Sequence, residues 1–274
     1  MNEATTAPMA GTDAGTHFRD GRLADAIEAA GRAVKLQPGT AAPRVLLAEL
    51  LLFTGNFARA DTVLDAAEAA DPSAALVIAE FRQLLRAAAQ RQKVFTEGQL
   101  PEFLGAPAPA QRHALAALVA VRAGDAAAAT VAAAAAEAAR PSVAGRMGAS
   151  DGDVAFDDFR DADDVVGGTI EALTTTGKYF WIPTDRMISM EFHPTTRPRD
   201  LLWRRCTMVV RDGPDGDVYV PALYDMPPDA TDLLRLGRAT NWTDTAPVRG
   251  SGQRVFLVGN DGFPIQQLTE IEFT

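Results

Sequence analysis

A pairing of glycine with proline recurs along the first half of this 274-residue chain. Gly21, Gly55 and Gly124 are each followed 17 residues later by a proline, and the first two of these units start 34 residues apart. Glycine permits a tight turn because it adopts positive φ at no steric cost. Proline ends a helix because it lacks the backbone N–H and clashes with the preceding turn. The spacing therefore predicts pairs of helices, with the glycine between the two helices of a pair and the proline after the second.

Small residues occupy matching positions in the second helix of each predicted pair. They are Ala26, Ala60 and Ala129 at one position and Ala33, Ala67 and Ala136 seven residues later. Small side chains let neighbouring helices approach closely, and a 34-residue period with this pattern is typical of tetratricopeptide repeats. A helical pattern continues over residues 76–94, and the glycine- and proline-rich segment 98–109 interrupts the array. We therefore expect a tetratricopeptide-like helical domain over residues 17–145.

The unit 41–72 shows the repeat most clearly and provides the first candidate binding surface. Its first helix has one apolar face for packing, and Val45, Glu49 and Leu52 are predicted to be the exposed positions on its inner side. Stacked repeats form a concave surface that suits an extended or helical peptide. These three residues are therefore predicted to contact a partner.

After Gly177 the pattern changes to short strands rich in β-branched and aromatic residues. The predicted strands are Tyr179–Ile182, Met187–Phe192, Cys206–Arg211, Val218–Leu223, Val255–Val258 and Thr269–Phe273. Two turn signals, 212–216 and 260–262, separate neighbouring strands. The predicted fold class is α+β, with N-terminal tetratricopeptide-like helical repeats followed by a small, mainly antiparallel β domain.

The remaining segments set the predicted domain limits. Residues 1–16 have no apolar core of a signal peptide and are predicted to be a disordered lead-in. The glycine-rich segment 141–153 is predicted to be a hinge. The acidic run 157–164 is predicted to start a helix that ends near Gly177, because acids favour the positive end of a helix dipole. An acidic α+β domain is thus expected over residues 154–274.

The net charge of −10 is concentrated in the second half of the chain. Residues 151–274 hold 21 acidic and 12 basic side chains, a net charge of −9. Such a surface repels nucleic acid and anionic membrane, so neither is an expected partner. It suits a basic or neutral protein partner, and it equally suits plain solubility. The single Cys206 excludes an internal disulfide and favours a reducing compartment such as the cytoplasm.

Candidate chemistry is sparse. Asp157, Asp158, Asp161 and Asp164 could present carboxylates together, but no histidine lies near them in sequence, and a solvated acidic turn is the favoured interpretation. His17, His113 and His193 are scattered, and no nucleophile–base motif or phosphate-binding loop is present. Cys206 is interpreted as a small buried strand residue rather than an activated thiol. We predict no catalytic residue, no metal and no cofactor.

Four short pieces in the second half carry a family resemblance. They are GKYFWIP at 177–183, RDLLW at 199–203, PALY at 221–224 and LGRATNW at 236–242. In this order they resemble the C-terminal region of the ImpE/TagJ family of type VI secretion accessory proteins. The resemblance implies a non-enzymatic protein associated with the contractile sheath. It implies binding to an N-terminal segment of the small sheath subunit TssB and, in some systems, a link to the disassembly ATPase ClpV.

Alternatives remain open at this point. The partner could instead contact the aromatic sheet around Trp181, Trp203 and Arg204. The chain could be a general peptide-binding adaptor. It could also be a small acidic hydrolase, in which case Asp157, Asp161 and Asp200 would converge in a pocket with a metal.

Overall fold

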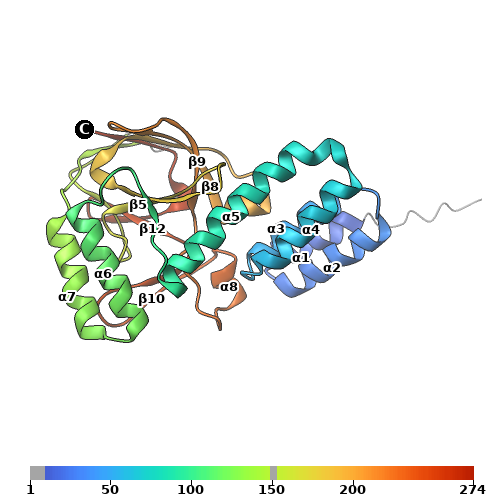
Figure 1. The fold of residues 1–274 in the computed structure, drawn as a ribbon, viewed down its shortest axis with the longest axis horizontal. Helices are drawn as coiled ribbons and strands as arrows, with labels where there is room; N and C mark the ends of the chain where they lie inside the picture. The colour runs from blue at the N-terminus through green and yellow to red at the C-terminus, as the bar shows by residue number, and fades with distance from the viewer. Residues whose placement is uncertain (1–9, 149–152) are drawn as a thin grey trace, which may run out of the picture. The chain divides into compact units, whose positions relative to one another are not determined.

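A computed structural model describes residues 10–148 and 153–274 (Figure 1). The chain divides into two compact units, Met1–Arg82 and Gln83–Thr274. This packing boundary lies within a helix, whereas the sequence analysis placed its boundary between residues 145 and 154. The last helical pair therefore belongs to the second compact unit. The described residues contain no helix long and apolar enough to cross a bilayer.

The first unit is built from helical pairs. Its helices are α1 (Ala10–Arg19), α2 (Leu23–Leu36), α3 (Ala42–Leu52), α4 (Phe57–Ala70), the 3-10 turn η1 (Pro72–Ala74) and the beginning of α5 (Ala75–Glu97). Gly21 and Gly55 lie between the helices of the two pairs and have φ of 82° and 69°. Ala26 and Ala60 are completely buried. The predicted repeat register is confirmed, since the glycines make the turns and the small residues lie in the core.

One prediction for this unit is wrong in part. The disordered lead-in was expected to extend to residue 16, but α1 begins at Ala10 and Ala14 is 1% exposed. Helix α1 packs against α2, the second helix of its pair. The rings of Phe18 and Phe53 pack edge to face, with their centroids 5.2 Å apart. The first nine residues lie outside the described part of the chain.

The second unit combines three helices with a large sheet. Beside the C-terminal part of α5 it contains α6 (Pro109–Ala123), α7 (Ala126–Ala139) and the short α8 (Asp232–Arg235). Gly124, with φ of 72°, makes the turn between α6 and α7, which lie side by side in green in Figure 1. The Gln111 side chain of α6 donates to the backbone oxygen of Trp181, and Thr130 of α7 donates to that of Ala246. These contacts explain why the third helical pair packs with the sheet.

The main sheet has nine strands in the order β1-β6-β5-β9-β8-β7-β14-β2-β3. The strands are β1 (Glu102–Phe103), β2 (Gly145–Met147), β3 (Val154–Phe156), β5 (Thr169–Leu173), β6 (Tyr179–Pro183), β7 (Met187–Phe192), β8 (Trp203–Val210), β9 (Gly216–Pro221) and β14 (Glu270–Phe273). All pairs are antiparallel except β1 with β6. The predicted mainly antiparallel sheet is confirmed.

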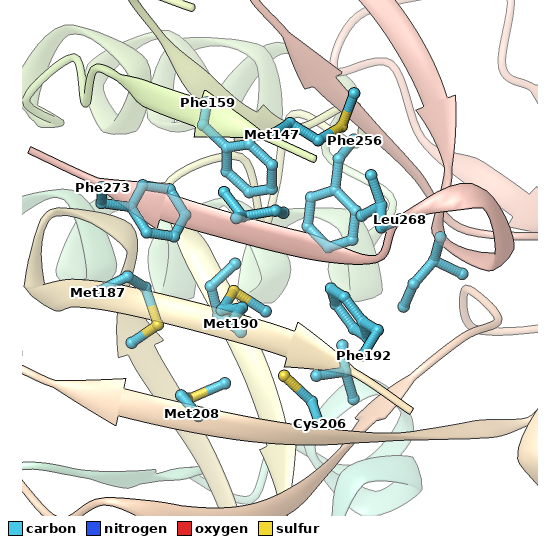
Figure 2. Close-up of a cluster of buried hydrophobic side chains, with 14 of the residues drawn as sticks. Met147, Phe159, Met187, Met190, Phe192, Cys206, Met208, Phe256, Leu268 and Phe273 are labelled. Carbon is cyan, nitrogen blue, oxygen red and sulfur yellow. The ribbon is translucent and has the colours of Figure 1, made fainter. Parts of the chain in front are cut away.

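Two smaller sheets complete the second unit. One contains β4 (Phe159–Asp161), β12 (Val255–Val258) and β13 (Asp261–Pro264), and the other pairs β10 (Thr240–Trp242) with β11 (Gly250–Gly252). Three 3-10 turns, η2 (Thr184–Arg186), η3 (Pro198–Leu201) and η4 (Ile265–Gln267), connect strands. The core between the main sheet and β4/β12 contains sulfur-bearing and aromatic side chains, including Met190, Met208, Cys206, Phe159 and Phe256 (Figure 2).

Two sequence predictions for this region are wrong. The acidic run does not start a helix, because residues 159–161 and 169–173 form β4 and β5 with turns between them. Asp161 and Asp163 of this run pair with Arg254 and Arg249, which are distant in sequence. Asp164 pairs with Arg160, four residues before it. Part of the predicted hinge is the strand β2, paired with β14; Ser150 and Gly152 of that hinge lie outside the described residues.

Candidate functional site

The predicted peptide-contacting residues of the first unit are less accessible than expected. Val45 is half-buried, and Glu49 and Leu52 are each 3% exposed. All six residues from Leu47 to Leu52 are buried, so α3 is enclosed on nearly every side over its last turns. The expectation that Glu49 and Leu52 are exposed is wrong, because one-face periodicity does not reveal that neighbouring helices cover the other face as well.

The accessible apolar side chains of the first unit lie elsewhere. Leu76 is 83% exposed and Val77 is 45% exposed. Both lie at the start of α5, the first α-helix after the repeat unit 41–72. Leu36, at the end of α2, is 70% exposed. Water contact with apolar side chains of this size is unfavourable, so residues 76 and 77 are candidates for coverage by a partner.

The aromatic segment of the second unit is a core rather than a surface. Trp181 is fully buried, and Trp203 and Arg204 are each 5% exposed. Arg204 donates to the backbone oxygens of Ile265 and Leu268 at 2.6 and 3.1 Å, so its guanidinium ties β8 to the chain before β14. These three predicted partner-binding residues are therefore not accessible to a partner in this structure.

Below these aromatics lies a buried ionic network centred on Arg254. Its guanidinium donates to Asp161 of β4 at 2.8 Å and also to Glu171 of β5. Arg91 of α5 donates to the same Glu171 carboxylate at 2.7 Å. Arg254, Asp161 and Glu171 are all 0% exposed. The network thus joins α5, β4, β5 and the residue preceding β12.

Aromatic hydroxyls complete the hydrogen bonding of this network. The Tyr179 hydroxyl donates to Glu171 and accepts from the Trp181 indole at 2.6 Å. The Tyr224 hydroxyl donates to Asp161 at 2.8 Å. Two residues of the resemblance motifs, Tyr179 and Tyr224, therefore serve to satisfy buried carboxylates, which would otherwise be costly to bury.

The two carboxylates of the network differ in proton affinity. Burial acts to raise the pKa of Glu171, but the nearby Arg254 and Arg91 outweigh it and lower that pKa to about 2. Burial raises the pKa of Asp161 to about 7, because Arg254 offsets the loss of solvent only in part and Asp163 adds repulsion. Glu171 is thus the anionic centre of the network, and Asp161 accepts a proton near neutral pH.

The carboxylates considered for a hydrolytic site have different surroundings. Asp157 is exposed, and Asp200 accepts the backbone N–H groups of Thr196 and Arg197 at 2.8 and 2.9 Å. Asp161 belongs to the buried network. Over residues 10–148 and 153–274, no three histidine, cysteine or acidic side chains are grouped as metal ligands. This arrangement does not support the hydrolase alternative.

Cys206 is a core residue, as the sequence analysis expected. It is fully buried in the cluster of Figure 2. Burial raises the pKa of its thiol to about 12, which disfavours a reactive thiolate.

Comparison with known proteins identifies the family. The ImpE protein family model matches residues 153–272, and a tetratricopeptide repeat model matches residues 17–91. The chain is 32% identical over 258 residues to the type VI secretion system accessory component TagJ of Pseudomonas aeruginosa, a match that covers 93% of this chain and 89% of that protein. The chain belongs to the ImpE/TagJ family.

The fold of this ImpE/TagJ protein also has a close structural relative. The crystal structure of the protein VPA1032 from Vibrio parahaemolyticus superposes with a TM-score of 0.86 at 27% sequence identity, over 95% of this chain and 97% of that one. The resemblance noted in the sequence motifs is thereby confirmed, and this member is an accessory component of type VI secretion.

Sequence reasoning missed the network's central acid and the accessible tryptophan. Glu171 lies in the otherwise apolar strand TIEAL, and an acid in such a strand signals a buried partner. Trp242 is 39% exposed, unlike the buried Trp181 and Trp203. In the sequence, Trp242 differs from the other two tryptophans in that it ends the last family motif, LGRATNW.

Proposed function

We propose that this chain is a non-enzymatic cytoplasmic adaptor that binds the N-terminal segment of the small sheath subunit TssB. The observation that carries the proposal is the identity with TagJ over nearly the whole of both chains. The tetratricopeptide match over residues 17–91 supports a peptide-binding role for the first unit. A link to the ATPase ClpV is the further role that the family resemblance suggests.

The proposed contact surface is the side of the first unit formed by the first helices of the repeats. Val45 on α3 is half-buried, and Leu76 on α5 is exposed. An amphipathic segment of TssB would cover these apolar side chains, as amphipathic helices do in hydrophobic grooves. Glu49 and Leu52 would support this surface from below instead of contacting the peptide.

The test is a titration of a fluorescently labelled TssB N-terminal peptide against the full chain. We expect Leu76→Asp and Val45→Asp to weaken binding at least about tenfold, since apolar anchors dominate such interfaces. Leu36→Asp, at an exposed apolar position in the second helix of a pair, is the matched control and should bind like the unmodified protein. Absence of binding by the unmodified protein would refute the proposal, and equal losses in all three variants would refute the assigned surface.

A second titration separates the two partners. ClpV is added to the preformed complex of adaptor and TssB peptide, and the size of the assembly is measured. A ternary complex supports the link, whereas displacement of the peptide or no association contradicts it without affecting the TssB titration.

A further inference from the structure

The second unit has an apolar groove beside the turn between α6 and α7. It has a volume of about 200 Å³, and its apolar walls include Val121, Ala126, Ala129 and Pro247. Pockets for drug-sized ligands measure about 300–1,000 Å³, so this groove is too small for them. Its size matches the entry of a single apolar side chain.

Arg249 is the one charged residue among the described residues that line this groove. Its Nε donates to both carboxylate oxygens of Asp163, at 3.0 and 2.8 Å, and its guanidinium carbon lies 5.9 Å from the centre of the Phe95 ring. Its two terminal nitrogens make no hydrogen bond to any residue that the structure describes. The guanidinium is thus held in place by its inner nitrogen, and its outer N–H groups remain available.

The described acidic residues around Arg249 do not accept hydrogen bonds from its terminal nitrogens. Asp163 is occupied, because its carboxylate also accepts the backbone N–H groups of Val165 and Gly250 at 2.9 and 3.1 Å. Asp225 interacts electrostatically with Arg249 and Arg91, but within residues 10–148 and 153–274 no hydrogen bond or ion pair joins its carboxylate to Arg249. A carboxylate brought by a partner would therefore find a cation with free donors.

Trp242 immediately precedes Thr243, which is one of the residues that line the groove. It pairs with Gly250 across β10 and β11, directly beside Arg249, and its neighbour Thr243 accepts the backbone N–H of Arg249 on its side chain. The ring packs edge to face on Tyr224 at 5.6 Å while remaining 39% exposed. Tryptophan and arginine are the residues most enriched among those that dominate binding at interfaces.

We propose that the groove, Arg249 and Trp242 form a docking site for a protein segment that presents one medium-sized aliphatic side chain next to a carboxylate. The aliphatic side chain fills the groove, the carboxylate pairs with the outer N–H groups of Arg249, and Trp242 covers the segment. The donors of Arg249 select this occupant, because Asp163 holds only its inner nitrogen and no described residue accepts a hydrogen bond from its terminal nitrogens. The rest of the segment is neutral or basic, since residues 151–274 carry a net charge of −9. This surface is separate from the sheath-peptide surface proposed above and would hold a different partner.

The probes are short capped peptides added to ¹⁵N-labelled full-length protein. The first contains leucine beside glutamate, in either order, within glycines; the second replaces glutamate by glutamine; the third replaces leucine by alanine. The Trp242 indole N–H signal, assigned with Trp242→Phe, should shift with the first peptide at millimolar concentration. The glutamine and alanine peptides should each bind at least about fivefold more weakly. Equal shifts by the glutamate and glutamine peptides, or no shift with any of them, would overturn the proposal.

Variants locate the contact. Val121→Asp places a carboxylate in the groove and should abolish the shift, whereas Val131→Asp, at a 71% exposed position of α7 outside the groove lining, should not alter it. If Val121→Asp fails to fold, Ala126→Leu at an exposed position fills the groove instead. Equal binding by the filled and unfilled protein contradicts the site. A concentration-dependent dimer that buries Trp242 without peptide would show that a second copy occupies the groove, and would also overturn the proposal.

Discussion

Arg254 joins two buried carboxylates in the interior of the second unit. It is completely buried and lies between the carboxylates of Asp161 and Glu171. A buried ion pair need not stabilise a fold relative to an apolar core, but removal of one partner leaves an uncompensated charge. The two carboxylates differ in the number of arginines with which they pair. Glu171 pairs with Arg91 as well as with Arg254, whereas Asp161 pairs with Arg254.

The first prediction compares the two acids by neutral substitution. Glu171→Gln should lower the free energy of unfolding by about 3–5 kcal/mol, since it removes the carboxylate that pairs with both Arg254 and Arg91. Asp161→Asn should cost only about 1–3 kcal/mol, since an amide retains an acceptor for Arg254. Urea denaturation at pH 7 measures both. A larger loss for Asp161→Asn would show that the centre of the network has been misassigned.

The second prediction concerns pH. The pKa of Glu171 is lowered to about 2, so its contribution is present above its unfolded value of 4.5 and is lost as pH falls toward 2. The pKa of Asp161 is raised to about 7, so the folded protein holds a proton that the unfolded chain releases above 3.8. Stability from this group therefore declines as pH rises from about 4 to about 7. Asp161→Asn should remove that decline in urea melts between pH 4 and 8, and an unchanged profile contradicts the assignment.

At the scale of elements, each helical pair depends on small residues where its helices cross. Gly55 makes the turn, and Ala60 is buried completely three residues into α4 after Phe57. Asn56 caps this helix by accepting the N–H of Arg59 at 3.2 Å, so α4 starts at a defined residue. The position of Ala60 relative to α3 is thereby set by the turn and the cap.

The third prediction tests this crossing. Ala60→Leu should overpack it and lower stability by about 1–3 kcal/mol. Ala58→Leu, two residues away on the exposed side of α4, adds the same side chain and should leave the melting temperature nearly unchanged. Thermal melts of both variants decide the matter, since equal midpoints would contradict the packing at Ala60.

At the scale of the whole molecule, the second unit needs elements that lie before residue 154 in the sequence. Arg91 of α5, Gln111 of α6 and the Arg140 residue after α7 bond to Glu171, Trp181 and Asp158. These contacts join segments about 20 to 80 residues apart in the sequence. The β region matched by the ImpE family model is therefore only part of the folding unit.

The fourth prediction follows from this dependence. A fragment of residues 154–274 should fail to melt cooperatively, because it leaves Glu171 and Arg254 without Arg91 and lacks helices α6 and α7 and strands β1 and β2. A fragment of residues 75–274, which retains all of α5, should give a cooperative melt and a monomeric elution volume. If residues 154–274 alone melt like the full chain, the elements before residue 154 do not contribute to the folding of the rest of the sheet.

Local sequence determined much of this protein. The glycine turns, the alanine positions, most strands after Gly177 and the family itself follow from spacing and motifs, because turns and side-chain periods are short-range properties. Tertiary structure alone decided the rest. The acidic run forms β4 and buried turns because Arg254 and Arg249, about 90 residues away in the sequence, bind the carboxylates of Asp161 and Asp163. Leu52 and Trp181 became core residues because other elements cover them, and the available donors of Arg249 exist only where Asp163 holds its inner nitrogen. Burial and charge pairing depend on contacts between distant segments, and no local pattern contains them.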